Sequence, residues 1–295
     1  MRQLEYFIAV ADEANFTRAA QRVHISQSGV SAQIRQLEHD LGATLIDRSG
    51  RTATLTAAGA AALPHARAVL ASAGAVRRAV DDVNGLIRGR LVVGMVTACT
   101  VTPLFNALAA FHQAHPRVEI TLIEDNSDQL TERVRAGQAD LALIGASGAP
   151  PPGLGALPII SERLVAALPP GHPLAGHRRV TLADVTAYPI VCLPAGTGIR
   201  TVLDQACAAQ GIRPDIALQA SAPGAVADLA SRGLGIAILS ESMAARHDTL
   251  KTLIIDDIQT PAVLALIWTE TDSPALRELL HHSRQAFTSP PHPAA

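Results

Sequence analysis

The sequence predicts an α/β protein in which a small winged helix-turn-helix comes first, a long helix follows, and a larger α/β domain of two lobes completes the chain. Three observations predict this order. Apolar residues recur with helical spacing over the first 41 residues, two short strand-like runs surround an Arg/Gly turn soon after, and strand-like and helix-like segments alternate from residue 91 to residue 239. The length of 295 residues suffices for two domains. An apolar content of 48% and a charged content of 17% exclude a disordered or collagen-like chain.

Two short helices are expected at the start of the chain. The first has one apolar face, formed by Leu4, Phe7, Ile8 and Ala11. The second has a similar face, formed by Phe16, Ala19, Ala20 and Val23, and Thr17 is placed to cap its first turn. This region is also the most basic part of the chain, since residues 15–37 hold three arginines and no acid. Such a segment favours contact with a polyanion, although a solvated helix face would have the same charge.

A third helix follows after the tight connection formed by His24 and Ile25. Ser26 is expected to cap its start and Gly42 to end it, and its apolar stripe consists of Val30, Ile34, Leu37 and Leu41. Two short helices joined by a few residues form a helix-turn-helix. With Val30 inward, the outer face is short and polar, and it carries Gln27, Ser28, Ser31, Ala32, Arg35 and His39. Such side chains suit the major groove of DNA, yet an ordinary amphipathic surface helix would look the same.

A wing is predicted next. Residues 44–47 and 52–55 have the pattern of two short strands, and Arg48 and Arg51 flank the turn between them. A hairpin with paired arginines is suited to a minor groove, although any exposed hairpin tip can be charged.

A long Ala-rich helix is expected from residue 56 to about residue 84. Its heptad seam consists of Ala62, Ala66, Val69, Ala73, Val76, Val80 and Val83, which predicts close packing against another helix. Pro64 lies inside this helix and is expected to kink it or to end its first segment. Residues 85–90 have the composition of a hinge into the next domain.

The residues described so far resemble a known family. The segment FTRAAQRVHISQSGVSAQIRQLEHDLGATLIDRSGRTATLTAAG closely resembles the winged helix-turn-helix of LysR-type transcriptional regulators, and the resemblance continues through the whole chain. Two positions depart from the family pattern. Gly29 stands where Ala is usual, at a cost of about 1 kcal/mol of helix stability, and Ala32 stands where many members have Arg, which removes a groove contact and changes the expected operator preference.

The resemblance implies a sequence-specific regulator of transcription that binds an interrupted palindrome in double-stranded DNA as a homodimer or homotetramer. The candidate DNA-binding residues are Thr17, Arg18, Gln27, Ser28, Ser31, Gln33, Arg35, Arg48 and Arg51. The implied domains are residues 1–58 for DNA binding, residues 59–88 for the linker helix and hinge, and residues 89–295 for effector binding. Within the last, one lobe takes about 89–162 and 267–295 and the other about 163–266.

The remaining two hundred residues predict two small α/β lobes. In the first, strands are expected at residues 91–96, 118–124 and 139–144. Thr102 is expected to cap one helix, with Pro103 at its first position, and a second helix is expected at residues 128–136. In the second, strands are expected at residues 190–193, 215–220 and 236–239, with helices at 199–210 and 224–231. This alternation indicates parallel sheets. The family resemblance implies a periplasmic-binding-protein-like domain with crossovers near residues 161–163 and 266–268.

An effector site is expected where the strands end, because ligands of open α/β sheets lie at the carboxyl ends of strands, beside helix N-termini. The candidate effector-binding residues are Thr97, Thr100, Thr102, Asn126, Gly145, Gly196, Thr197, Arg200 and Ser221. Their hydroxyls, amide and backbone N–H groups suit a small polar or anionic molecule, and an aromatic content of 3% argues against a large planar one. Each of these residues could instead be an ordinary cap or turn residue.

No enzyme, cofactor or metal is expected. The sequence lacks the GxSxG, HExxH, P-loop and GxGxxG motifs. The pairs His112 with His115 and His281 with His282 lack the i, i+4 spacing and companion acids of a zinc site.

The three cysteines, Cys99, Cys192 and Cys207, form no CxxC motif and are expected to be reduced thiols. Cys99 and Cys192 at strand ends raise the alternative of redox sensing. However, the peroxide-sensing branch of the family places its reactive Cys just before the Arg that matches Arg200, and here that residue is Ile199. Buried, unreactive thiols are therefore the preferred interpretation.

A cytoplasmic location is expected, because acids at Glu5 and Asp12 interrupt any secretory pattern and the two long uncharged stretches are broken by prolines and polar residues. A solute-binding protein for transport would share the two lobes, but it needs export.

Overall fold

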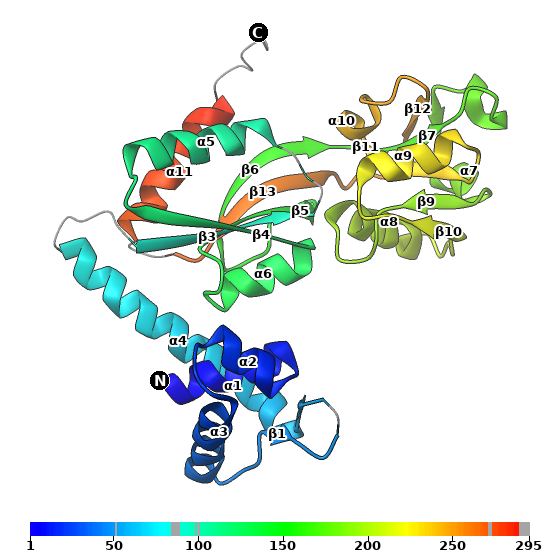
Figure 1. Ribbon diagram of the computed structural model, residues 1–295. Coiled ribbons are helices and arrows are strands. Elements are labelled where there is room, and N and C mark those ends of the chain that lie inside the picture. The colour runs from blue at the N-terminus through cyan, green and yellow to red at the C-terminus, as the bar shows by residue number, and fades with distance from the viewer. Residues whose placement is uncertain (51, 84–88, 98, 100, 271–272, 289–295) are drawn as a thin grey trace. The chain divides into compact units, whose positions relative to one another are not determined.

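The computed structural model describes residues 1–295 except 51, 84–88, 98, 100, 271–272 and 289–295, and for residues 71, 75, 77–83 and 288 it describes the backbone alone (Figure 1). The chain divides into two compact units. The first contains the helices and short strands up to residue 83, and the second contains the two sheets that follow. Within the described residues, no helix is long and apolar enough to span a bilayer.

The first unit is a three-helix domain with a wing and a long helix. Its elements are α1 (Arg2–Glu13), α2 (Phe16–Arg22), α3 (Gln27–Leu41), β1 (Ile46–Asp47), β2 (Thr54–Leu55) and α4 (Ala57–Val83). The strands β1 and β2 pair antiparallel, which confirms the predicted wing with shorter strands. The core contains the residues of the predicted apolar faces, among them Phe7, Val10, Ala19, Ala20, Val30, Ile34 and Leu37.

The ends of α2 and α3 confirm some expectations and correct others. Ser26 caps α3 by accepting a hydrogen bond from the Gly29 N–H, and Gly42 ends it in the left-handed conformation, as predicted. The cap of α2 is Asn15, not Thr17, because the Asn15 side chain accepts the N–H groups of the first turn. Leu41 is exposed rather than buried, since it lies in the last turn of α3, where the helix ends.

The long helix α4 is continuous through Pro64, so the alternative that its first segment ends there is wrong. Pro64 is exposed, and the helix continues for nearly twenty residues beyond it. Ala66 of the predicted seam is buried in the first unit, whereas the side chains of Val69 and Val76 are 48% and 66% exposed. Val80 and Val83 of the seam lie outside the described side chains.

The first lobe of the second unit is built on a five-stranded sheet in the order β4-β3-β5-β13-β6. These strands are β3 (Gly89–Val96), β4 (Val118–Asp125), β5 (Leu141–Ser147), β6 (Gly155–Glu162) and β13 (Ala262–Trp268). The helices of this lobe are α5 (Thr102–Ala114), α6 (Ser127–Arg135) and α11 (Pro274–Thr288). The first residue of α5 is Thr102, but Val101 occupies the capping position, so the prediction that Thr102 caps this helix is off by one residue.

The second lobe is built on a six-stranded sheet in the order β10-β9-β11-β7-β12-β8. Its strands are β7 (Leu164–Leu168), β8 (Arg179–Val180), β9 (Ile190–Cys192), β10 (Ile216–Gln219), β11 (Ile236–Ser240) and β12 (Lys251–Ile255). Its helices are the 3₁₀-helix η1 (Pro173–Gly176) and α7 (Leu182–Thr186), α8 (Gly198–Ala209), α9 (Pro223–Ser231) and α10 (Glu241–Ala244). All residues of β7, β9 and β11 are buried, as expected for central strands.

Both sheets are mixed rather than purely parallel, which corrects the sequence prediction. β13 runs antiparallel to β5 and β6, and β7 runs antiparallel to β11 and β12. The chain passes to the second lobe at Arg163, between β6 and β7. The return lies before Ala262, not near residues 266–268, because β13 pairs along its length with strands of the first lobe. Short apolar runs in a sequence carry no signal of strand direction. The direction of each strand is known only from its pairing in the structure.

The two lobes touch where α8 begins. A Cβ atom on Gly198 would lie 2.4 Å from the carbonyl carbon of Gly145 and 2.5 Å from the Ala146 nitrogen. Gly198 is therefore required by close backbone contact between the start of α8 and the end of β5.

We expect Gly198→Ala to destabilise the protein by about 1–3 kcal/mol, because the added methyl group meets backbone atoms that cannot rotate away. Urea unfolding of the full chain measures the loss. Gly171→Ala is the matched control, since among the described residues no atom beyond its two chain neighbours lies within 4 Å of the position its Cβ would take. Equal unfolding midpoints for the two variants would contradict the close contact.

Candidate functional sites

A polar groove on the first unit collects residues from the start of α2, from α3 and from the wing. This recognition groove is lined by Asn15, Phe16, Thr17, Gln27, Ser31, Arg35, Arg48, Gly50, Thr52 and Ala53. Five of the nine candidate DNA-binding residues thus lie around one concave surface. Ser28 and Gln33 are exposed elsewhere on α3, Arg18 is exposed on α2, and Arg51 lies outside the described residues.

Two of the candidates differ from expectation in their surroundings. Ser31 keeps only 9% of its surface exposed, so it belongs to the wall of the groove and not to the outermost face of α3. Arg18 pairs with Glu13 of α1, with 3.4 Å between its Nε atom and the carboxylate, and its guanidinium also donates to the Glu13 carbonyl. Its side chain is nevertheless mostly exposed, so a phosphate could still be reached.

A buried carboxylate joins α3 to the wing. Glu38 Oε1 accepts the N–H groups of Leu45 at 2.9 Å and Ile46 at 3.1 Å, and Oε2 accepts Arg48 Nη2 at 2.7 Å. The guanidinium of Arg48 also lies over the ring of Phe16, 5.5 Å from its centre. Arg48 therefore forms an ion pair inside the first unit, although it also borders the recognition groove.

The Glu38 carboxylate is stabilised in its charged form. Burial alone would raise the pKa of Glu38, but the N–H groups of Ile46 and Leu45 and the nearby Arg48 together lower this pKa below its ordinary value. Sequence reasoning missed Glu38. The signal was its position four residues after Ile34, on the apolar face of α3, where an acid requires a partner.

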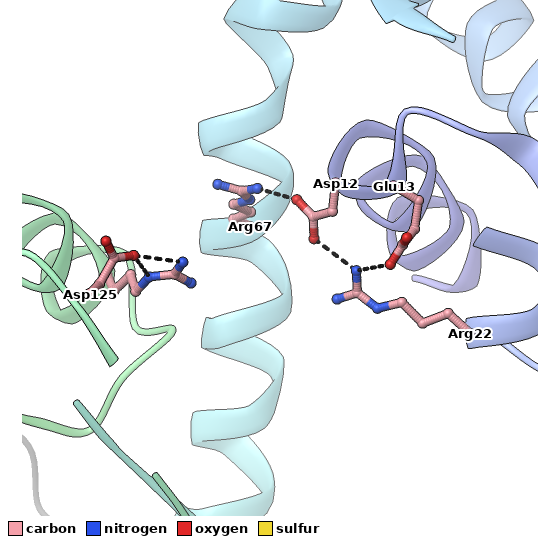
Figure 2. A network of polar contacts seen from close by, with 6 residues as sticks. Asp12, Glu13, Arg22, Arg67 and Asp125 are labelled. Carbon is pink, nitrogen blue, oxygen red and sulfur yellow. Dashed lines mark hydrogen bonds and ion pairs between the residues drawn. The ribbon is translucent and has the colours of Figure 1, made fainter. Parts of the chain in front are cut away.

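An ion-pair network holds α4 against the first two helices (Figure 2). Asp12 of α1 lies between two arginines, with 2.5 Å to Arg67 of α4 and 3.2 Å to Arg22 of α2. Arg22 also lies 3.5 Å from Glu13. Because Asp12 connects both guanidinium groups, the start of the long helix is tied to α1 and α2 by charge as well as by apolar packing.

At the candidate effector site, the ends of β3 and β4 lie side by side. The Thr97 N–H donates to the Asp125 carbonyl at 3.1 Å. The Asp125 side chain, labelled in Figure 2, forms an ion pair at 3.2 Å. Its partner is Arg133 of α6. Thr97 is exposed at this edge of the sheet. The edge thus presents polar groups, as the parallel pairing of these strands requires.

Residues of both lobes meet at one place, here called the lobe junction and formed by Asn126, Ser127, Gly145, Gly196, Thr197 and Gly198. The Ser127 N–H donates to the Gly196 carbonyl at 3.0 Å, and Ser127 Oγ accepts the Gly145 N–H at 3.0 Å. Gly196 has a φ of 84°, and a Cβ there would lie 3.1 Å from the Asn126 side chain. Four of the candidate effector residues are thus brought together.

The glycines and Thr197 of the lobe junction have clear structural roles. Gly145 lies inside β5, not after it, and packs against Gly198. Thr197 caps α8, since its hydroxyl accepts the Arg200 N–H at 3.4 Å and donates to the Pro194 carbonyl at 2.9 Å. Their local contacts are thus those of capping and packing residues.

The other candidates lie apart from these contacts. The Arg200 guanidinium binds Asp204 at 2.7 Å and Gln219 at 3.1 Å, and its side chain is mostly buried. Thr102 is exposed as the first residue of α5, Ser221 is exposed two residues before α9, and Thr100 lies outside the described residues. The positive charge of Arg200 is thus matched by Asp204.

The cysteines lie in surroundings that disfavour the thiolate. Cys192 and Cys207 are buried as predicted, whereas Cys99 is only partly buried. Burial raises the pKa of all three thiols. For Cys192 this holds although the Arg200 guanidinium, 3.7 Å from the sulfur, favours the thiolate. Protonated thiols are poor nucleophiles, so this environment gives no support to redox sensing.

The chain matches known proteins along almost its whole length. Residues 84–288 match the LysR substrate binding domain, and residues 1–60 match the bacterial regulatory helix-turn-helix protein of the lysR family. The chain is 37% identical over 241 residues to the transcriptional regulator ShiR of Corynebacterium glutamicum (strain R). The aligned region covers 81% of each of the two chains. It is 35% identical to a probable hydrogen peroxide-inducible genes activator of Mycobacterium avium, over 81% of this chain and 77% of that protein.

Among solved structures, full-length CbnR in complex with its target DNA is 29% identical, with a TM-score of 0.60 over 97% of this chain and 99% of that one. The fold class predicted from the sequence is confirmed by these matches.

We expect Glu38→Gln to lower the free energy of unfolding by about 1–3 kcal/mol at neutral pH, because a neutral amide leaves Arg48 without its carboxylate partner. The pKa of Glu38 is lowered by folding, so its contribution is complete above the ordinary value of 4.5 and is lost as the pH falls through the folded-state value. The difference between wild type and variant should therefore shrink below pH 4.5.

Thermal unfolding at neutral and acidic pH tests this expectation. Asp40→Asn is the control, because Asp40 is an exposed acid of the same helix that bonds only Gln36 among the contacts described for it. A loss of stability that is equal in the two variants, or that does not change with pH, would refute the role given to Glu38.

Proposed function

The chain belongs to the LysR family of DNA-binding transcriptional regulators, and we propose that its parts divide the work as follows: residues 1–58 read DNA, residues 59–88 join two copies, and residues 89–295 sense an effector. The observation that carries the proposal is the recognition groove. It brings the N-terminal turn of α3, the start of α2 and the wing to one surface, with two arginines on its border. The substrate binding domain of the family covers the part of the chain assigned to sensing.

For DNA, we propose that α3 enters the major groove with its N-terminal turn leading. Gln27 and Arg35 then face base edges, Gln27 suited to adenine and Arg35 to guanine or phosphate. Thr17 and Arg48 lie beside α3 at the groove, and Arg18 is exposed on α2; their hydroxyl and guanidinium groups suit phosphates. The relative CbnR, in complex with its target DNA, supports a role of this kind for the matching domain.

We propose that the protein acts as a homodimer or homotetramer. Val69 and Val76 lie seven residues apart on α4, and both are strongly exposed in the single chain. A partner helix that covers these positions would remove this apolar surface from water and place two α3 helices on an interrupted palindrome.

We propose that the effector is a small polar or anionic molecule that binds between the two lobes. The lobe junction supports this location because the Ser127 N–H of one lobe donates to the Gly196 carbonyl of the other at 3.0 Å. A molecule bound beside them would favour one spacing of the lobes. It can control transcription only through a difference in its affinity for the two states.

In the DNA-binding test, we expect Arg35→Ala to weaken binding to the specific operator by about 1–3 kcal/mol, or roughly 5- to 150-fold, because a bidentate base contact is lost. Fluorescence anisotropy with fragments from beside the protein's own gene gives the affinity, with random-sequence DNA measured in parallel. Arg179→Ala, which removes an exposed arginine of β8, is the charge-matched control and should leave binding unchanged. An equal loss for specific and random DNA would show that Arg35 contacts phosphate only, and no loss would remove α3 as the reading element.

In the effector test, the full chain is screened by thermal shift against small carboxylates and phosphates. A ligand at 100 times its dissociation constant should add about 2.7 kcal/mol to stability. We expect Asn126→Ala combined with Ser221→Ala to abolish most of the shift, measured from the midpoint of the ligand-free variant. Ser231→Ala, at the opposite end of α9, should keep it. A shift that survives the double substitution would place the effector elsewhere.

A further inference from the structure

The first lobe carries a group of metal-ligating side chains that neither the DNA-binding surface nor the lobe junction uses. His115, Glu278 and His282 each offer one ligand atom, and these three atoms all lie within 4.8 Å of one another. We propose that they form a binding site for a divalent transition-metal ion, with zinc as the best fit. The proposal stands apart from the function proposed above, because no residue is shared.

The three ligands come from two helices that pack together. Glu278 and His282 are four residues apart on α11 and therefore share one face of that helix. His115 follows the last residue of α5, and its N–H donates to the Phe111 carbonyl at 2.8 Å. In Figure 1, α5 and α11 lie side by side, and both contribute to the core of the first lobe. The helix packing thus sets the distance between the ligands.

The two imidazole rings are held by a buried aromatic residue. Phe111 is fully buried, and its ring centre lies 5.0 Å from that of His115 and 6.1 Å from that of His282. The His282 ring meets Phe111 edge-on, and the His115 ring is tilted against it. Contacts with a fixed ring limit the rotation of both imidazoles, so part of the ordering cost of a metal site is met before the ion binds.

The ligand types favour a transition metal over calcium or magnesium. Zinc binds imidazole nitrogen at about 2.0–2.1 Å and carboxylate oxygen at about 2.0–2.2 Å, so tetrahedral ligands lie ~3.3 Å apart. A separation of at most 4.8 Å can be closed by small side-chain rotations. Two nitrogens and one oxygen suit zinc, nickel or cobalt, whereas calcium and magnesium prefer oxygen alone. Three protein ligands leave a fourth position for water.

The burial of the three residues also fits an ion site. His115, Glu278 and His282 are all half-buried. An ion can therefore reach them from solvent, and once bound it would be partly covered by the two helices. Their histidine neighbours differ, because His112 and His281 are exposed and His281 bonds Gln285 at 2.8 Å. The sequence pairs of histidines are therefore split, with one member of each directed to the site and one to the surface.

A bound ion would connect the C-terminal helix α11 to α5. Because the unfolded chain cannot hold the three ligands together, binding favours the folded state. Zinc at 100 times its dissociation constant should raise the melting temperature by roughly 5–10 °C for a domain of this size.

The test uses the untagged, full-length protein after treatment with a chelator. Zinc chloride is titrated in competition with a chromophoric zinc indicator, and the visible absorption of bound Co²⁺ reports four-coordinate geometry. We expect one zinc ion per chain at this site. Glu278→Gln, His115→Ala and His282→Ala should each weaken binding at least tenfold, since even the loss of a residue that only supports a metal ligand costs 10–100-fold. His112→Ala and His281→Ala are the matched controls and should bind zinc as the wild type does.

The melting temperatures of the zinc-free variants separate binding from folding. Glu278→Gln keeps the size of the side chain, so its zinc-free melting temperature should equal that of the wild type while the zinc-dependent rise disappears. Wild-type protein that binds no zinc would overturn the proposal. Equal weakening by the control and site variants, or unchanged binding in Glu278→Gln, would also overturn it.

Discussion

The second unit depends on one constraint, which is that the chain passes between its two sheets twice. β6 leads directly into β7 through Arg163, and the chain returns to the first sheet only when β13 begins at Ala262. Because β13 then pairs with both β5 and β6, the first lobe is completed by residues that follow the whole second lobe. The two lobes are therefore held side by side by the backbone itself, and the close approach of Gly145 and Gly198 follows from that proximity.

This constraint also explains why residues at the candidate effector site take part both in hydrogen bonds between the lobes and in helix capping. Strand ends from both lobes meet, so Ser127 and Gly196 share a backbone hydrogen bond, and Thr197 caps the helix that packs there. Polar groups at this junction hydrogen-bond to one another. Under the proposed function, an effector bound beside them would change these bonds and thereby favour one spacing of the lobes.

In the first unit, two carboxylates connect different elements by binding several donors each. Glu38 collects two backbone N–H groups and Arg48, and Asp12 collects Arg67 and Arg22. The basic character of this region is thus partly matched by acids inside the unit. Arg35 is exposed on the outer side of α3 and borders the recognition groove, which suits it to a partner outside the chain.

The sequence by itself determined the elements whose signals are local. The helical spacing of Phe7, Val30 and Ile34, the cap at Ser26 and the end at Gly42 need only a few neighbouring residues, and each is confirmed. The direction of β13, the second crossing, the buried partners of Glu38 and the grouping of His115 with His282 were decided by tertiary structure alone. In each case the partners lie far apart along the chain or in another element, and hydrophobic periodicity carries no information about which distant segments will pair. Only packing brings such residues together.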